Sequence, residues 1–411
     1  MEKAGLSKAL AVQPAPAAEV AELWETPKLR ALFAAVPGLE AWVMRQQMEV
    51  TAIAAPTGLE GLRAEWMLRQ FQALGLQAGV DEAGNVVAER AGARRGEPVL
   101  AVTAHLDTAF APGTAVTVER RRGRVWAPGI ADNGAGLAAL LAMARLLRDA
   151  HCRPRRGLLL VATVGEEGEG DLRGMRHLFA PGSKLGRRIG ATVVLDGPGD
   201  DQITTGALPS RRLRVVFTGP GGHSWSDLGR ASATHAAVRA AGALLAQVHP
   251  RPGVLGCNIG VLQGGTVVNA IAAGAELKLD LRARSREGLE ELGQAVRRAV
   301  ASGLEQERAA ALRGAVRARI EPLGERPGGA LAAGSPLLEL VRQADARLGI
   351  RSRQQFASTD ANIPIAQGRD ALRLGAGGSG GGIHTLGEWF EPEGRARALQ
   401  RLLLIVLAWC G

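Results

Sequence analysis

The chain has 411 residues, 46% hydrophobic and 22% charged, which is typical of globular proteins and long enough for two or more domains. Its net charge of +10 permits acidic partners, but the arginines are scattered and aromatic residues make up only 3%. We therefore expect no nucleic-acid partner. The three cysteines lie far apart, which excludes a disulfide framework and a CxxC metal site and favours a reducing compartment.

Neither end of the sequence predicts a membrane anchor. The first residues, MEKAGLSKALAVQPAPAAEV, lack the apolar core of a signal peptide, and residues 1–18 are expected to form a loose tail. The final run, LQRLLLIVLAWCG, is apolar but far shorter than the roughly 20 residues that span a bilayer. We expect it to form a helix packed on the core of a cytoplasmic protein with no membrane partner.

Helices are predicted first, over about 19–50 and 60–75, where apolar residues recur every three or four positions and Gly75 provides a stop. Three continuously apolar runs follow, as expected of strands buried on both faces: PVLAVTAHLD, RRGLLLVATVGEEGEG and GATVVLDGPG. Between the first two lies DNGAGLAALLAMARLLRDA, a turn followed by an amphipathic helix. This order predicts an α/β open sheet, in which ligands bind beyond the carboxyl ends of the strands.

The pattern changes near Leu208, where SRRLRVVFTG alternates polar and apolar residues like a half-exposed strand. A helix, two strands (GVLGCNIGVLQGG and AELKLDLRARS), a further helix and a strand near 314–321 follow. The order βαββαβ is that of an α+β, ferredoxin-like split sandwich. We therefore predict that an inserted domain interrupts the first domain, with the boundaries 19–208, 209–320 and 321–411.

Polar side chains able to bind metal follow the apolar strands. They are His105, Asp107, Asp132, Glu166, Glu167, Asp196 and, in the glycine-rich stretch GAGGSGGGIHTLGEWF, His384. Imidazole and carboxylate ligands together suit zinc, with cobalt or manganese as substitutes. In two-metal hydrolases the ions lie ~3.5–4 Å apart, which a bridging carboxylate makes possible.

Each of these residues also has a simpler interpretation. His105 alone suggests a buried histidine satisfied by a neighbour, Asp132 a helix N-cap, Asp196 a turn, the Glu166–Glu167 pair a solvated loop, and His384 a flexible linker. However, adjacent carboxylates at the end of an apolar strand repel each other unless a cation is present. One carboxylate as ligand and the other as general base is a consistent alternative. The joint occurrence of all these residues at strand ends favours a metal site.

The motifs TAHLDT, PGIADNGAG, VGEEGEGDLRG, VLDGPG, GPGGHSW and GGGIHTLGEW resemble, in order and spacing, those of the co-catalytic dinuclear zinc exopeptidases and amidohydrolases. That family includes peptidase T, carboxypeptidase G, acetylornithine deacetylase, succinyl-diaminopimelate desuccinylase and the aminoacylases. The resemblance extends from about residue 40 to the end of the chain. It implies a zinc-peptidase-like open mixed sheet flanked by helices, with an inserted α+β ferredoxin-like lid or dimerisation domain.

The resemblance also implies a role for each residue. Two zinc ions per chain would be held by His105, Asp132, Glu167, Asp196 and His384, with Asp132 bridging the ions. Asp107 would orient His105. Glu166 would be the general base, taking a proton from the attacking water and delivering it to the leaving amine. The peptide bond between Asp132 and Asn133 is expected to be cis.

Three further residues are implied in the inserted domain. His223 in GPGGHSW would help to bind the substrate and stabilise the oxyanion, reaching the active site of the second chain in a homodimer formed through the lid. Asn269 and Arg282 would contact the substrate carboxylate or carbonyl. Ala272 stands where the family often has proline near that asparagine, and Arg282 alternatively is a surface arginine on a strand edge.

We therefore expect a metal-dependent hydrolase that cleaves small peptides or N-acyl amino acids. Asp196 favours a di- or tripeptide exopeptidase resembling peptidase T. The reason is that the family usually has Asp at this position in its aminopeptidases and dipeptidases, and more often Glu in its carboxypeptidases and deacylases. The alternatives are an N-acyl-amino-acid amidohydrolase of the deacetylase or desuccinylase kind, and a non-catalytic homologue that binds metal or ligand.

Overall fold

The computed structural model describes residues 20–411, so the predicted tail over residues 1–18 lies outside the described residues. The helical pattern expected over 19–50 is divided among α1 (Val20–Glu25), α2 (Pro27–Ala35), the 3-10 turn η1 (Val36–Leu39) and α3 (Glu40–Ala52). Pro27 and Pro37 each stand in the first turn of a new element. Proline is tolerated there but not inside a helix, which explains the interruptions. The second predicted helix is α4 (Gly61–Ala73).

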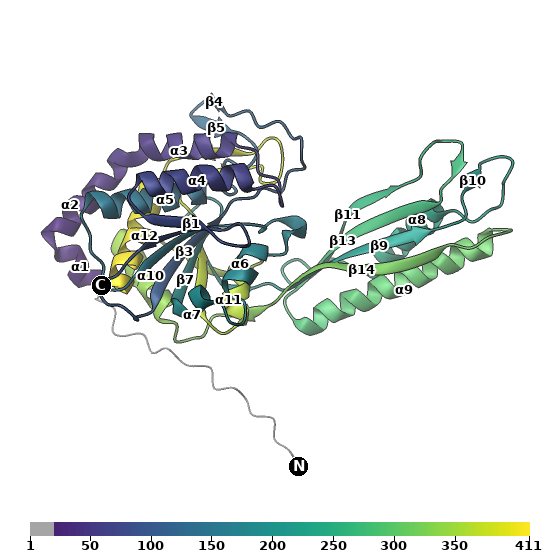
Figure 1. Cartoon of the computed structure of the whole chain (residues 1–411). Helices are drawn as coiled ribbons and strands as arrows, with labels where there is room; N and C mark the ends of the chain where they lie inside the picture. The colour runs from purple at the N-terminus through teal and green to yellow at the C-terminus, as the bar shows by residue number, and fades with distance from the viewer. Residues whose placement is uncertain (1–19) are drawn as a thin grey trace, which may run out of the picture.

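A main sheet of nine strands forms the centre of the larger part of the molecule and contains strands from both the N-terminal and the C-terminal halves of the chain (Figure 1). Its order is β1-β2-β6-β3-β7-β17-β8-β15, with β16 also paired to β8. The strands are β1 (Gln77–Val80), β2 (Val86–Arg90), β3 (Val99–His105), β6 (Leu158–Thr163), β7 (Ile189–Leu195), β8 (Gln202–Ala207), β15 (Gly329–Ala330), β16 (Arg353–Ala357) and β17 (Asp370–Leu374). The central strands β6, β3, β7 and β17 run parallel, whereas β2 and β8 join them antiparallel. The sheet is therefore mixed, as predicted.

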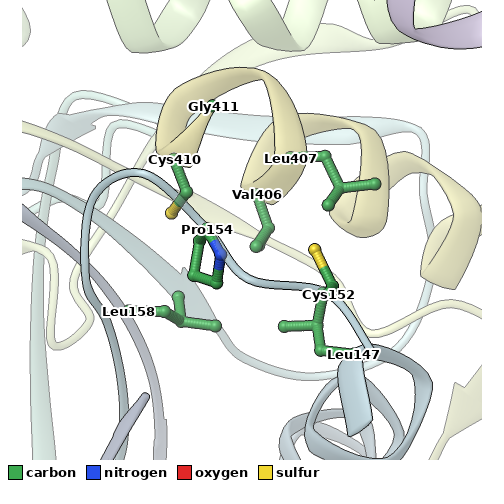
Figure 2. A pocket seen from close by; sticks show the side chains of 8 residues that line it. All are labelled: Leu147, Cys152, Pro154, Leu158, Val406, Leu407, Cys410 and Gly411. Carbon is green, nitrogen blue, oxygen red and sulfur yellow. The ribbon is translucent and has the colours of Figure 1, made fainter. Parts of the chain in front are cut away.

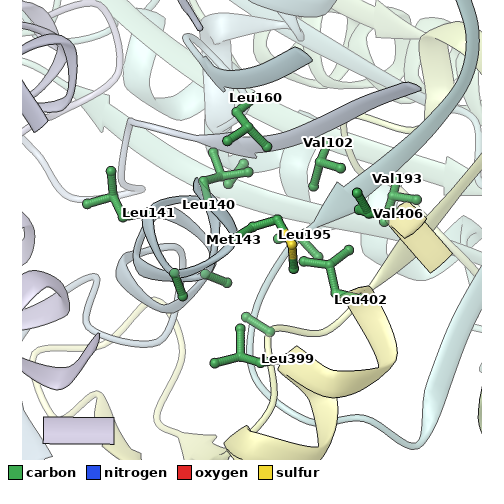
Figure 3. Close-up of a cluster of buried hydrophobic side chains, with 14 of the residues drawn as sticks. Val102, Leu140, Leu141, Met143, Leu160, Val193, Leu195, Leu399, Leu402 and Val406 are labelled. Carbon is green, nitrogen blue, oxygen red and sulfur yellow. The ribbon is translucent and has the colours of Figure 1, made fainter. Parts of the chain in front are cut away.

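Helices cover both faces of the main sheet. Val102 of β3 and Val193 of β7 pack among side chains of α5 (Gly134–Asp149) and α12 (Arg395–Cys410), as Figure 3 shows. The alternate strand residues, such as Ala101, pack on the other face in a cluster that includes α6 (Arg173–Leu178) and α11 (Asn362–Ala366). The short α7 (Lys184–Arg188) precedes β7, and α10 (Pro336–Leu348) packs against α12. The C-terminal apolar run is thus a core helix, as predicted.

A second, four-stranded sheet lies between β8 and β15 in the sequence, in a segment that we call the inserted unit (residues 210–326). Its antiparallel order is β11-β13-β9-β14, and α8 and α9 pack on one face. The elements are β9 (Ser210–Thr218), β10 (Gly222–His223), α8 (Ala233–Gln247), β11 (Leu255–Gly264), β12 (Ala270–Ile271), β13 (Gly274–Ala283), α9 (Arg286–Ala310) and β14 (Arg317–Arg326). The predicted βαββαβ order is present, with β10 and β12 as an added two-stranded pair.

Strand β14 continues beyond the predicted end near residue 321. Pro322 and Gly324 suggest the end of a strand, but they only shift the register of its pairing with β9. After it, Arg326 still pairs with Ser210. A bulge absorbs an extra residue without ending a strand. The inserted unit therefore reaches the main sheet with its last strand intact, and Gly329 pairs with Ala207 only three positions later.

A small sheet places the glycine-rich stretch. Its order is β18-β19-β5-β4, with β4 (Glu119–Arg121), β5 (Arg124–Trp126), β18 (Ser379–Gly381) and β19 (Trp389–Glu391). His384 lies in the loop between β18 and β19. The glycine-rich stretch is therefore ordered by strand pairing, and the flexible-linker interpretation is wrong.

The cysteines lie away from the carboxyl ends of the strands. None of the three, all of which lie within residues 20–411, forms a disulfide, and Cys152 and Cys410 line a small apolar pocket where α12 ends (Figure 2). Burial raises the pKa of the Cys410 thiol to about 12. The same pocket is lined by Leu158, at the amino end of β6. Among residues 20–411, no helix is both long enough and apolar enough to cross a membrane.

The contact between α8 and α9 gives a test of the inserted unit. A Cβ atom at Gly303 would lie 2.6 Å from the backbone nitrogen of Ala240, so Gly303→Ala should lower the free energy of unfolding by ~1–3 kcal/mol through overpacking. Gly242 has nothing within 4 Å of its Cβ position, and Gly242→Ala should raise stability by ~0.5–1 kcal/mol. Urea denaturation of both variants measures this, and a stable Gly303→Ala chain would contradict the close packing.

Candidate metal centre

The central strands end beside one another and carry the predicted residues there. His105 is the last residue of β3, Glu166 and Glu167 follow β6, and Asp196 directly follows β7. The fourth parallel strand, β17, leads into the glycine-rich stretch. Because parallel strands have their carboxyl ends at one edge of the sheet, residues far apart in sequence meet there.

Asp132 reaches the same place from the turn before α5. Its peptide bond to Asn133 is cis, as the sequence resemblance implied. Asn133, not Asp132, is the N-cap of α5: its side chain accepts a hydrogen bond from the Gly136 N–H and donates one to the Leu195 carbonyl. The interpretation of Asp132 as a simple helix cap is therefore wrong, and its carboxylate is free to face the strand ends.

Close backbone approaches explain the glycines before His384. A Cβ atom at Gly378 would lie 2.4 Å from the Phe390 ring, and one at Gly375 would lie 2.3 Å from the Gly199 carbonyl, just after Asp196. His384 itself has a φ of 63°, in the left-handed region that few side-chain-bearing residues adopt. The stretch thus packs against the Asp196 loop and turns back sharply at the histidine.

The five predicted metal ligands converge. The Asp132 carboxylate lies between the two imidazoles, with Oδ1 at 2.9 Å from His105 Nε2 and Oδ2 at 3.3 Å from His384 Nε2. Glu167 Oε1 lies 2.8 Å from His384 Nε2, and Asp196 Oδ1 lies 3.9 Å from His105 Nε2. Ligand atoms of His105, Asp132 and Glu167 all lie within 4.8 Å of one another, close enough for one ion.

The buried Asp107 carboxylate organises the loop after β6. It accepts hydrogen bonds from the backbone N–H groups of Glu166 (2.9 Å) and Glu167 (2.8 Å) and from the Thr57 hydroxyl (2.9 Å). Its Oδ1 lies 3.6 Å from His105 Nδ1, while the Asp107 carbonyl is nearer to that nitrogen, at 3.0 Å. Burial would raise the pKa of Asp107, but the His105 ring and the two N–H groups outweigh it and lower the pKa. Asp107 therefore contacts His105 chiefly through its backbone.

The partner of Glu166 is Arg326, a residue that the sequence did not predict for the site. Arg326, at the end of β14, donates from Nη1 to Glu166 Oε1 at 3.0 Å and from Nη2 to the Glu166 carbonyl. Both side chains are buried, at 3% and 7% exposed. Burial raises the pKa of Glu166 well above its usual value; Arg326 opposes this and Glu167 adds to it. The two residues are 160 positions apart, so no local pattern could have linked them.

Two other buried charges were also missed. The Glu388 carboxylate accepts hydrogen bonds from the backbone N–H groups of Gly129, Ala131 and Asp132, and burial raises its pKa to about 7. Arg63 donates to the carbonyls of Ile53, Thr51 and Leu106, and burial lowers its pKa to about 10. Glu388 lies within the quoted motif GGGIHTLGEW, whereas Arg63 looks like an ordinary charged residue of an amphipathic helix.

The predicted residues of the inserted unit lie in two places. Arg282 is near the junction with the main sheet, with Nε donating to Asp280 Oδ2 at 2.7 Å. His223 and Asn269 lie beside the pair β10–β12, at the end of the inserted unit remote from the main sheet (Figure 1). Both are exposed, and His223 Nδ1 accepts hydrogen bonds from the N–H groups of Trp225 and Ser226. Within one chain they do not join the ligand cluster.

The donor set fits divalent metal. Asp132, Glu167 and Asp196 are at most 13% exposed and crowd around two imidazoles. Burial raises the pKa of Asp196, and the neighbouring Asp132 raises it further. Bound cations would offset this repulsion, and the ligand types are those that zinc prefers. Asp132 has one carboxylate oxygen facing each histidine, so its position is compatible with a carboxylate ligand.

Comparisons with known proteins agree with this chemistry. A family model described as peptidase family M20/M25/M40 matches residues 101–408. A curated relative from Pyrococcus furiosus, named a putative [LysW]-lysine/[LysW]-ornithine hydrolase, is 30% identical over 166 residues. That match covers 40% of this chain and 44% of the relative, so the chain spans less than half of the relative's length.

Solved structures share the fold over nearly the whole chain. A tripeptidase from Staphylococcus aureus matches with a TM-score of 0.70 and 20% identity, covering 90% of this chain and 98% of that one. Aminopeptidase PepT from Bacillus cereus matches with a TM-score of 0.65 and 19% identity, covering 90% and 99%. The dipeptidase Dug1p from Saccharomyces cerevisiae has a TM-score of 0.76 and 12% identity, covering 93% and 98%.

Replacing Asp107 with asparagine should weaken metal binding. An amide has one acceptor oxygen where the carboxylate serves the N–H groups of both Glu166 and Glu167, so one buried donor loses its partner at a cost of about 1–3 kcal/mol. We expect a ~10–100-fold loss of metal affinity, measured by equilibrium dialysis against zinc buffers. Asp149→Asn, on the exposed end of α5, is the control. Unchanged affinity of Asp107→Asn would show that this carboxylate does not set the ligand positions.

Proposed function

The chain belongs to peptidase family M20/M25/M40, and we propose that this hydrolase is a dinuclear-zinc exopeptidase that cleaves di- or tripeptides. The observation that carries the proposal is the convergence of five metal-ligand side chains, with Asp132 between the two histidines and a sixth polar residue, Glu166, bound beside them by Arg326. Members of this family are typically metal-dependent.

We assign two zinc ions, with Co²⁺ or Mn²⁺ as substitutes, to His105, Asp132, Glu167, Asp196 and His384. Asp132 would be the ligand shared by both ions, since one of its oxygens faces each histidine. When bound, such ions polarise the scissile carbonyl and lower the pKa of the attacking water. Glu166, which is not among the assigned ligands, is left for proton transfer.

Glu166 is the proposed general base. It is buried beside the ligands, yet its carboxylate is held by Arg326 rather than by His105 or His384. A carboxylate in this position takes a proton from the attacking water and passes it to the leaving amine. Its environment therefore supports a catalytic role distinct from that of its neighbour Glu167, which faces His384.

Substrate recognition is assigned to Arg282, Asn269 and His223. Arg282 pairs with Ser210 near the junction with the main sheet, and its guanidinium suits a substrate carboxylate. Asn269 and His223 are too remote to act on the ligands of their own chain in this arrangement, so we propose that they serve the site of the second chain in a homodimer formed through the inserted unit. There His223 donates to the developing oxyanion.

An N-acyl-amino-acid amidohydrolase is the second candidate. The Pyrococcus relative is named a putative [LysW]-lysine/[LysW]-ornithine hydrolase, and a hydantoinase/carbamoylase-family amidase from Burkholderia vietnamiensis shares the fold with a TM-score of 0.71 and 18% identity. Asp196 favours the peptidase, because family members with this residue are usually aminopeptidases or dipeptidases. A non-catalytic homologue is disfavoured, since both the ligand set and Glu166 are present.

A hydrolysis screen tests the function. The zinc-loaded protein should cleave di- and tripeptides with a free α-amine faster than N-acetyl or N-succinyl amino acids, and a chelator should abolish the activity. Glu166→Gln is the control: general base catalysis contributes ~10²–10⁴-fold, so turnover should fall accordingly while metal content is retained. Faster cleavage of acylated amino acids would favour the second candidate, and loss of metal from Glu166→Gln would make Glu166 a ligand.

The role of His223 in the second chain has its own test. Glu166→Gln and His223→Ala chains should each be weakly active. For His223→Ala, the loss of one oxyanion donor should lower kcat by ~10²–10³-fold. Mixed after dissociation and reassociation, they should form heterodimers with one site that has both an intact Glu166 and an intact His223. Activity should return in the mixture. If differently tagged chains co-purify and no activity returns, His223 does not act across the dimer.

A further inference from the structure

The loop that follows β6 is held by side chains of the inserted unit as well as by Asp107. This base loop (residues 165–170) carries Glu166 and Glu167 and includes the 3-10 turn η2 (Gly168–Gly170). The adjacent strands β13, β9 and β14 each send one basic side chain to it. The loop is therefore held from two sides, by Asp107 next to β3 and by these three basic side chains of the inserted unit.

The contacts are graded in burial. Arg326 of β14, 3% exposed, binds the carboxylate and the carbonyl of Glu166. Arg212 of β9, 12% exposed, donates to the Gly168 carbonyl. Lys278 of β13, 30% exposed, pairs with Glu169 Oε1 at 2.6 Å. Arg326 is thus the least exposed of the three basic residues and binds Glu166 through both its carboxylate and its carbonyl.

Arg326 has little freedom to move. Besides Glu166, its Nη1 lies 3.4 Å from both the carbonyl and the hydroxyl of Ser358, which precedes α11, outside the inserted unit. Its backbone is fixed by strand pairing opposite Ser210, in the same row as Arg282. A planar guanidinium that binds one residue through both its side chain and its backbone fixes the orientation of that residue as well as its position.

We propose that Arg326 is a positioning residue that orients the Glu166 carboxylate, so that the inserted unit sets the geometry of the general base. This inference rests on the proposed function. The inserted unit then has a part in proton transfer within its own chain, separate from the residues it offers to a substrate or to a second chain. A displacement of β14 relative to the main sheet would be transmitted directly to the base.

The test uses the metal-loaded, full-length protein and the best substrate from the screen. Arg326→Gln should lower kcat by ~10–100-fold, the cost of a misplaced catalytic group, with KM close to the wild-type value and with metal content unchanged. Added guanidinium chloride should restore part of kcat, whereas equal sodium chloride should not. Arg326→Lys keeps the charge but loses the paired contact, and its kcat should be intermediate.

Arg211→Gln is the matched control. Arg211 lies on β9 next to Arg212, but it pairs with Glu325 and Glu290 and does not contact the base loop. Its kcat and KM should equal those of the wild type. In a Glu166→Gln background, Arg326→Gln should cause no further loss of kcat, because the group that it positions is already removed.

Three results would overturn the proposal. The first is a wild-type kcat in Arg326→Gln, and the second is a higher KM with unchanged kcat, which indicates direct substrate contact. The third is a further loss of kcat when Arg326→Gln is added to the Glu166→Gln background. If Arg326→Gln does not fold, wild-type kcat in Arg326→Lys would overturn it equally. If the wild-type protein cleaves nothing in the screen, the proposed function fails instead. The Arg326–Glu166 coupling is then measured by a double-mutant cycle of unfolding free energies, where additive effects would refute the contact.

Discussion

The structure depends on the collection of like charges at one edge of the main sheet. Parallel strands bring Glu166, Glu167 and Asp196 to the edge where Asp132 also arrives, although buried carboxylates repel one another. The surrounding chain offsets this repulsion locally. Imidazoles flank Asp132, Arg326 holds Glu166, and the backbone N–H groups of the two glutamates are aimed at Asp107. The proposed metal ions would offset the remaining repulsion between these carboxylates.

Much of the fold was predictable because its signals are local. Continuous apolar runs gave β3, β6 and β7, alternation gave β9, and the βαββαβ order gave the inserted unit. Where local signals mislead, a tertiary contact is responsible. Pro322 and Gly324 look like a strand end, but pairing with β9 carries β14 on to Arg326.

The candidate site was predictable to the extent that its residues stand at strand ends or in recognisable motifs. This holds for His105, Glu167, Asp196 and His384. It does not hold for Arg326, whose partner Glu166 is 160 residues away, nor for Arg63, whose three carbonyl partners are buried only after the helix has packed. A charged side chain that is buried by long-range packing has no distinctive neighbours in the sequence.

The order in which the chain is synthesised gives the position of His384 a further meaning. Roughly 190 residues separate it from Asp196, and they include the whole inserted unit and β17, the strand that pairs with β7. At about 5–20 residues per second, translation leaves the three earlier carboxylate ligands and His105 without their last partner for roughly 10–40 s. A nascent chain therefore presents an incomplete acidic cluster next to β7, which still lacks its neighbour β17, and a metal that needs all five proposed ligands would bind only after synthesis of the C-terminal part.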